Sequence, residues 1–92
     1  MTDTTCYKLL VEKRALDGWQ ALEVQHPDEM AELKLFLKQH PTNLRATSGK
    51  AKKLRGKLKK YYQYDVTYGD RVRYQVNKAE KTVAVIYAGS HP

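Results

Sequence analysis

The sequence is poor in cysteine and has no long apolar run. Cys6 is the only cysteine among 92 residues, which excludes an internal disulfide framework and fits a reducing compartment. The longest uncharged, mostly apolar stretch covers residues 82–90, far shorter than the roughly 18 residues of a membrane-spanning helix. The N-terminal residues MTDTTCYK lack the charge and the apolar core of a signal peptide. We therefore expect a cytoplasmic protein with no membrane partner.

The sequence also lacks the motifs of several enzyme classes. It contains no Gly-rich phosphate loop with its lysine and no nucleophile elbow. The three histidines, His26, His40 and His91, are scattered and do not have the spacing of metal ligands. We therefore expect no metal site and no cofactor. The length, with 41% hydrophobic residues, predicts a single domain over residues 1–92.

The basic residues are concentrated in the second half of the chain. Residues 1–49 carry six basic and seven acidic side chains, whereas residues 50–92 carry eleven basic and three acidic ones. The asymmetry is sharpest in the run KAKKLRGKLKK, whose charged members are Lys50, Lys52, Lys53, Arg55, Lys57, Lys59 and Lys60. Six of the seven tyrosines also lie in the second half. Positive charge interleaved with aromatic rings is typical of nucleic-acid binding, although such a run is often only a solvated loop.

The first half predicts one strand and two helices. Alternating apolar residues over 6–12 indicate a strand. Leu16, Trp19 and Leu22 then recur at helical spacing, in a helix that begins near Ala15 and ends at His26-Pro27. Pro27 suits the first position of a second helix, which ends at His40-Pro41. Its predicted buried stripe contains Met30, Leu33 and Leu37, with Phe36 beside them.

The second half predicts a basic loop followed by three strands. We expect residues 41–60 to be irregular, with one possible helical turn around residues 50–54. Apolar alternation then indicates strands over residues 61–66, 71–76 and 82–88, separated by turns at 68–70 and 77–81. The expected fold is α+β with the order β-α-α-β-β-β. The helical hairpin packs on one face of a mainly antiparallel sheet and leaves the other face open.

The alternation assigns side chains to the two faces of the sheet. Apolar neighbours are expected to face the helices, namely Tyr62, Tyr64, Val66, Val72, Tyr74 and Val76. The open face is then expected to carry Tyr61, Gln63, Asp65, Arg71, Arg73 and Gln75. A register shifted by one residue would bury Gln63 and Asp65, which is physically unattractive. Because guanidiniums bind phosphate bidentately, we expect Arg73 to contact nucleic acid. We expect Gln63, on the same face, and the neighbouring basic run to contact it as well.

Several segments together resemble the RelE/ParE superfamily of bacterial toxins. These segments are EKRALDGW at residues 12–19, KLRGKLKKYYQYDV, GDRVRYQV and the C-terminal VAVIYAGSHP. Their order and spacing cover nearly the whole chain. The resemblance implies the toxin of a toxin–antitoxin pair, with a cognate antitoxin as partner. The RelE and YoeB branches are ribosome-dependent mRNA endonucleases, whereas the ParE branch poisons DNA gyrase.

The resemblance to the ribonuclease branch implies roles for individual residues. In that branch the ribose 2′-OH attacks the adjacent phosphate, a reaction that needs a base, a cation and an acid. Arg71 matches the family's phosphate-stabilising arginine, and His91 is similar to a near-terminal histidine that acts as acid or base. Tyr61 can stack on a nucleobase of the RNA or donate a hydrogen bond to it. Asp65 can serve as a base if Arg71 or Arg73 pairs with it.

One departure from the family leaves two functions open. Ribonuclease members carry basic residues on the second strand, where this chain has Gln63 and Asp65. Their absence favours a non-catalytic alternative, such as a gyrase inhibitor or an RNA-binding module. The terminal histidine favours the endoribonuclease, with the ribosome and mRNA as partners.

Overall fold

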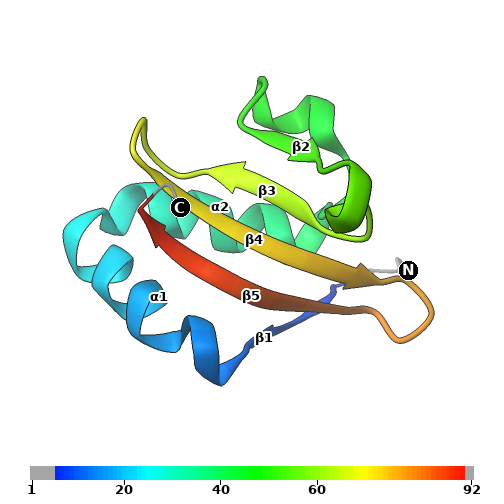
Figure 1. The fold of residues 1–92 in the computed structure, drawn as a ribbon, viewed down its shortest axis with the longest axis horizontal. Helices are drawn as coiled ribbons and strands as arrows, with labels where there is room; N and C mark the ends of the chain where they lie inside the picture. Colours follow the sequence, from blue (N-terminus) through cyan, green and yellow to red (C-terminus); the bar gives the residue numbers. More distant parts are fainter. Residues whose placement is uncertain (1–5, 91–92) are drawn as a thin grey trace.

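The computed structural model describes residues 6–90, which form two α-helices, two short 3-10 helices and one sheet (Figure 1). Their order is β1 (Lys8–Val11), α1 (Lys13–Gln25), α2 (Pro27–Gln39), η1 (Leu44–Thr47), β2 (Ala51–Lys53), η2 (Gly56–Leu58), β3 (Tyr62–Asp65), β4 (Asp70–Asn77) and β5 (Thr82–Ser90). The predicted α+β class and helical hairpin are confirmed. The expected order of elements is also correct, except for the strand added at β2.

The sheet places its long C-terminal strands at the centre. The strand order is β1-β5-β4-β3-β2, with β1 parallel to β5 and the other pairs antiparallel. Figure 1 shows that α1 and α2 both lie on one side of this sheet. Among the described residues 6–90, no α-helix covers the opposite side of β3, β4 and β5, as expected from the alternation.

The helices bury narrow apolar stripes against the sheet. The buried residues of α1 are Ala15, Trp19 and Leu22, and those of α2 are Met30, Leu33, Phe36 and Leu37. Leu16 shares the helical spacing of Trp19 and Leu22 but is 38% exposed. Helical geometry turns it about 100° away from Ala15, which takes the inward position instead. The first helix also begins at Lys13, two residues before the expected start.

The core face of the sheet matches the predicted alternation. Tyr64, Val66, Val72 and Tyr74 are all buried, with Tyr62 and Val76 packed against them. The Tyr62 and Tyr74 rings are stacked with their centroids 5.3 Å apart. The Tyr74 hydroxyl donates to the Pro41 carbonyl at 2.9 Å. Because a buried phenol needs such a partner, this bond fixes the end of α2 against the sheet.

The expectation of an irregular loop with a helical turn at residues 50–54 is wrong. Ala51–Lys53 is instead an edge strand, β2, paired antiparallel with Tyr62–Tyr64. Backbone bonds extend the pairing, from Asp65 N to Lys50 O at 2.8 Å and from Leu54 N to Tyr61 O at 3.0 Å. Lysines discourage further pairing at a sheet edge, so a basic run suits this position. Local propensity gave no sign of the strand, because pairing with β3 is what stabilises it.

Candidate nucleic-acid interface

A β-bulge adds one residue to the open face of the sheet. In the pairing of β4 with β5, Arg73 lies opposite Tyr87 and Tyr74 lies opposite Val85, so Ile86 is an extra residue. Before the bulge Val83 and Val85 are buried, and after it Ala88 is buried. Without the bulge, strict alternation would turn Tyr87 toward the helices. With it, Tyr87 lies beside Arg73 on the open face.

One row of side chains crosses four strands of the open face. The strand registers pair Lys52 with Gln63, Gln63 with Arg73, and Arg73 with Tyr87. The Arg73 Nε donates to the Gln63 Oε1 at 3.0 Å. The Arg73 guanidinium carbon lies 5.9 Å from the centre of the Tyr87 ring. The guanidinium is therefore held between an amide and an aromatic ring.

A second row brings Asp65 and Arg71 together. They are direct partners in the β3–β4 register. The Arg71 Nε lies 3.5 Å from the Asp65 Oδ1, with the Arg71 side chain 21% exposed. Among the residues described, this Nε is the one buried side-chain donor without a hydrogen bond. The contact is therefore an ion pair without good hydrogen-bond geometry, and it leaves Arg71 with unused donor capacity.

Gln63 differs from its expected exposure. It lies on the open face, but only 2% of it is exposed. Besides accepting from Arg73, it donates from Nε2 to the Asp65 Oδ1 at 3.4 Å. The expectation of a solvent-facing glutamine is wrong, because Gln63 is almost wholly buried with both ends of its amide bonded to Arg73 and Asp65. Gln63 therefore links Arg73 to the pair of Asp65 and Arg71.

The basic run does not form one uniform patch. Lys50 turns toward α2 and donates to the Glu32 Oε1 at 3.1 Å. This hydrogen bond raises the pKa of Lys50 above its ordinary value. Lys53 lies with its Nζ 5.3 Å from the centre of the Tyr62 ring. All basic residues of the run other than Lys50 are exposed, namely Lys52, Lys53, Arg55, Lys57, Lys59 and Lys60.

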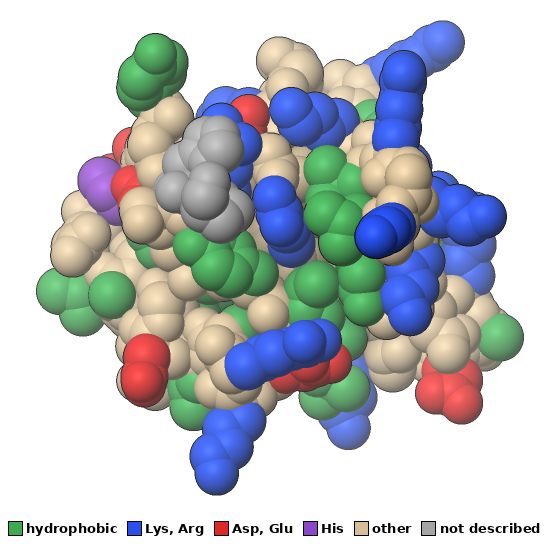
Figure 2. All heavy atoms as spheres, viewed as in Figure 1, with side chains coloured by type: hydrophobic (Ala, Val, Ile, Leu, Met, Phe, Trp, Pro, Cys, Tyr) green, Lys and Arg blue, Asp and Glu red, His purple; other side chains and the backbone are tan. Residues whose placement is uncertain are grey.

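The exposed members of the run lie at one end of the open face. Figure 2 shows lysine and arginine side chains gathered over the region of β2 and η2. Tyr61, just before β3, has its ring centre 5.4 Å from the Lys60 Nζ. The positive charge and an aromatic ring thus lie next to the rows that contain Arg73 and Arg71. This arrangement suits a single-stranded polyphosphate with stackable bases.

The expected role of His91 as acid or base stays a prediction. His91 lies outside the described residues, which end at Ser90. Ser90 pairs with Asp70 at the start of β4, next in sequence to Arg71. Tyr87 is the residue of this face that the sequence did not single out, because its orientation depends on the bulge at Ile86.

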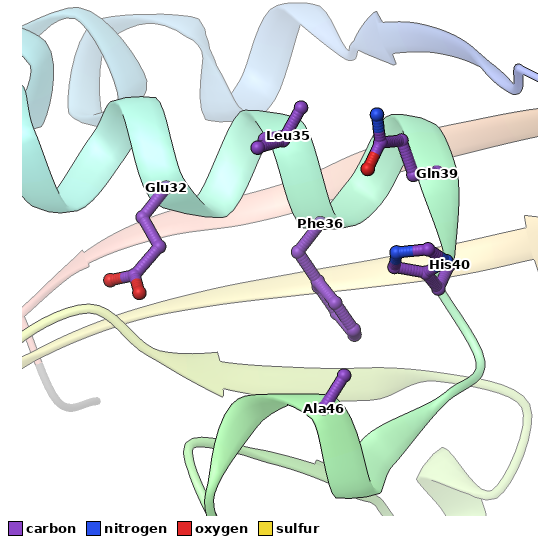
Figure 3. Close-up of a pocket in the computed structure, with 6 residues that line it drawn as sticks. All are labelled: Glu32, Leu35, Phe36, Gln39, His40 and Ala46. Carbon is purple, nitrogen blue, oxygen red and sulfur yellow. The ribbon is translucent and has the colours of Figure 1, made fainter.

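A shallow apolar pocket lies between α2 and η1 (Figure 3). Its lining residues are Glu32, Leu35, Phe36, Gln39, His40 and Ala46. The Glu32 carboxylate is already bonded to Lys50. Figure 3 shows no group of catalytic side chains converging there, so the pocket lacks the features of an active site.

Metal-binding clusters and membrane-spanning helices are both missing from the described part of the chain. Residues 6–90 contain no group of three or more His, Cys, Asp or Glu side chains arranged to hold a metal ion. No helix in the same range is long and apolar enough to cross a membrane.

Comparisons by sequence found no match, either to a known protein-family profile or to a curated protein. Comparison with solved structures shows the fold. The hairpin on a five-stranded sheet is the fold of the RelE/YoeB type of toxin, as the sequence resemblance implied.

Three solved structures illustrate the likeness. The archaeal RelE–RelB complex from Pyrococcus horikoshii has a TM-score of 0.70 at 21% identity, covering 92% of this chain and 94% of the other. A mutant of YafQ from E. coli has a TM-score of 0.70 at 16% identity, covering 92% and 93%. The YoeB/ParE toxin from Agrobacterium tumefaciens has a TM-score of 0.65 at 20% identity, covering 92% and 99%. At these identities the likeness is one of fold.

Proposed function

We propose that the protein is the toxin of a toxin–antitoxin pair and that it cuts mRNA on the ribosome. The observation that carries this proposal is the open sheet face, where Arg71 and Arg73 lie on one strand next to the exposed basic run. The structures with the same fold are toxins, and one of them is a complex with its partner RelB. A cognate antitoxin is the corresponding partner for this chain, and the cytoplasm is its compartment.

The proposed reaction breaks one phosphodiester bond by internal attack. The ribose 2′-OH loses its proton to a base and forms a bond to the adjacent phosphorus, and the 5′-oxygen leaves with a proton from an acid. The products are a 2′,3′-cyclic phosphate and a 5′-hydroxyl end. Arg71 stabilises the additional negative charge on the phosphorane with its Nη donors, because its Nε is buried beside Asp65.

The proton transfers are assigned to two residues, Asp65 as the candidate base and His91 as the candidate acid. Tyr61 stacks on a nucleobase or donates a hydrogen bond to the RNA. Asp65 meets the condition set by its charge, because Arg71 lies 3.5 Å away and offsets its repulsion of phosphate. The exposed lysines at β2 and η2 attract the RNA backbone without regard to sequence.

The alternative is a non-catalytic toxin that inhibits DNA gyrase. One observation favours it: β3, the first strand of the meander, offers Gln63 and Asp65 where a ribonuclease of this type has cations. The contact between Asp65 and Arg71 also reduces the net positive charge beside the expected phosphate.

Induced expression in bacteria with mapping of mRNA 5′ ends separates the two functions. The variants are Arg71→Ala and His91→Ala, with Lys78→Ala as a control in the exposed β4–β5 turn. We expect codon-phased cuts with the wild type and the control, and their loss in both site variants. Growth arrest with intact mRNA and induced DNA damage would contradict the ribonuclease and support the gyrase inhibitor. Thermal unfolding of each purified variant verifies that it is folded.

A further inference from the structure

The open face contains a buried glutamine to which the proposed reaction assigns no part. Gln63 is 2% exposed, so its amide cannot reach a bound RNA. A buried amide needs partners for both its oxygen and its nitrogen. Gln63 has them in Arg73, 3.0 Å from its Oε1, and Asp65, 3.4 Å from its Nε2.

These bonds connect the two arginines of the face. The Asp65 Oδ1 that accepts from Gln63 also lies 3.5 Å from the Arg71 Nε. The chain of contacts therefore runs from Arg73 through Gln63 and Asp65 to Arg71. The Arg73 Nε–H is bonded to Gln63, whereas the Arg71 Nε only lies beside Asp65 and has no hydrogen bond. A bonded Nε–H fixes the plane of the Arg73 guanidinium and leaves its Nη donors for a ligand.

Glutamine is the residue type that this position requires. Its amide accepts from a guanidinium and donates to a carboxylate at the same time. A glutamate at position 63 would place a second negative charge beside Asp65, and a lysine would have no acceptor for Arg73. The neutral glutamine thus preserves the positive charge of Arg73 while restricting its movement.

The two guanidiniums are spaced for a repeating anionic ligand. Arg71 and Arg73 are two residues apart on one face of β4, a separation of about 7 Å along the strand. The Tyr87 ring limits Arg73 on the side away from Gln63. Two guanidiniums side by side suit successive phosphates of one RNA strand better than a single isolated anion.

We propose that Gln63 is a positioning residue that orients Arg73, so that its guanidinium and that of Arg71 bind adjacent phosphates of a single RNA strand. The ligand named here rests on the proposed RNA-directed function. The positioning itself is a property of the free protein and is testable without RNA.

The first experiment measures the Arg73 Nε–H in the free protein by NMR. The signal is assigned by its absence from the Arg73→Lys variant. The test variant is Gln63→Met, which retains side-chain length but not the hydrogen bonds, and the control is Gln75→Met on the same strand as Arg73. We expect water exchange of this proton to become about tenfold faster in Gln63→Met and to stay unchanged in the control. An unchanged exchange rate in Gln63→Met overturns the positioning role.

The second experiment is a double-mutant cycle on binding of a short fluorescein-labelled single-stranded RNA. We expect Gln63→Met to weaken binding by about tenfold. We expect it to reduce the slope of log K against log salt by about 0.7, the value for one phosphate contact. Gln63→Met added to Arg73→Ala should have no further effect. Independent, multiplying effects would show that Gln63 does not act through Arg73, and would overturn the proposal.

The two experiments distinguish the failure of this proposal from the failure of the proposed function. If exchange is faster in Gln63→Met but the wild type binds no RNA, the RNA-directed function is wrong. The assignment of RNA phosphates as the ligand is then wrong too, while the positioning of Arg73 by Gln63 stands. If Gln63→Met does not fold, Gln63→Glu replaces it in the exchange test. We then expect the Arg73 Nε–H to remain protected while RNA affinity falls, because the new carboxylate keeps the acceptor but repels phosphate. Loss of protection in that variant overturns the proposal.

Discussion

Tyr87 lies directly opposite Arg73 in the β4–β5 pairing, with its ring centre 5.9 Å from the guanidinium carbon. This relationship exists because Ile86 is an extra residue in β5 and turns Tyr87 to the open face. The Tyr87 hydroxyl also donates to the backbone carbonyl of Ser90, which fixes the ring near the end of the strand. An aromatic ring, a guanidinium and a glutamine are thereby held in one row.

We expect Tyr87→Ala to weaken RNA binding by about two- to fivefold, because a cation–π contact at an exposed site contributes about 0.5–1 kcal/mol. Tyr87→Phe retains the ring and should bind like the wild type. Fluorescence anisotropy with labelled single-stranded RNA measures both variants. An equal loss in Tyr87→Phe would mean that the hydroxyl, rather than the ring, matters.

We expect Gly18→Ala to destabilise the protein. A Cβ at Gly18 would lie 1.8 Å from the Ala88 carbonyl oxygen, so α1 or β5 must move. Overpacking of this kind costs about 3 kcal/mol, against about 1 kcal/mol gained from the better helix propensity of alanine. The net loss in the free energy of unfolding should be about 2 kcal/mol, as measured by urea denaturation.

The matched control for this prediction is Gly69→Ala in the β3–β4 turn. A Cβ at Gly69 would meet no atom within 4 Å. Its free energy of unfolding should stay within about 0.5 kcal/mol of the wild type. A Gly18→Ala protein as stable as this control would show that α1 packs less closely on β5 than described.

We expect the protein to lose stability above about pH 10 through its buried tyrosines. Burial raises the pKa of both Tyr74 and Tyr64 above the ordinary value of a tyrosine. In the unfolded chain these phenols ionise near pH 10, whereas in the folded protein they stay neutral. The unfolded state therefore binds fewer protons at alkaline pH. The free energy of unfolding is unaffected below about pH 10. Above it, the free energy of unfolding falls by up to about 1.4 kcal/mol per pH unit for each tyrosine.

Absorbance at 295 nm, recorded with circular dichroism across an alkaline titration, measures this effect. The last tyrosines should ionise together with the loss of tertiary structure. Tyr74→Phe also removes the bond to Pro41, so it should lower stability at neutral pH but make the alkaline decline less steep. Ionisation of all seven tyrosines in a fully folded protein would contradict this expectation.

We expect the lysines of the basic run to contribute unequally to RNA binding. Lys50 is paired with Glu32 at 3.1 Å, whereas Lys52 is exposed on the edge strand. Lys52→Ala should reduce the slope of log K against log salt by about 0.7, and Lys50→Ala should change it little. Glu32→Gln should strengthen binding by releasing Lys50. Equal slopes for the two lysine variants would mean that RNA displaces the Glu32 contact.

The sequence predicted most of the fold because the main elements depend on short-range patterns. Pro27 and Pro41 delimited α2, and the alternation of tyrosine and valine delimited β3 and β4. Two features escaped prediction because they depend on partners far along the chain. β2 is stabilised by pairing with β3, and the bulge at Ile86 appears only when β5 is aligned with β4.

The candidate site followed the same division. The sequence predicted that Asp65, Arg71 and Arg73 share a face, since residues two apart on a strand point the same way. It did not predict the burial of Gln63 or the pairing of Lys50 with Glu32, because each requires side chains from other elements. His91 lies outside the described residues, and its role stays a prediction.

The sequence by itself determined the charge asymmetry, the helical hairpin, the antiparallel meander and the composition of the open face, because periodicity and charge are local properties of the chain. Only the tertiary structure decided which charges are free to act. It paired Lys50 with Glu32, set Asp65 beside Arg71, and joined Arg73 to Gln63 and Tyr87. Strand register and burial set these contacts, and both depend on the packing of the whole domain.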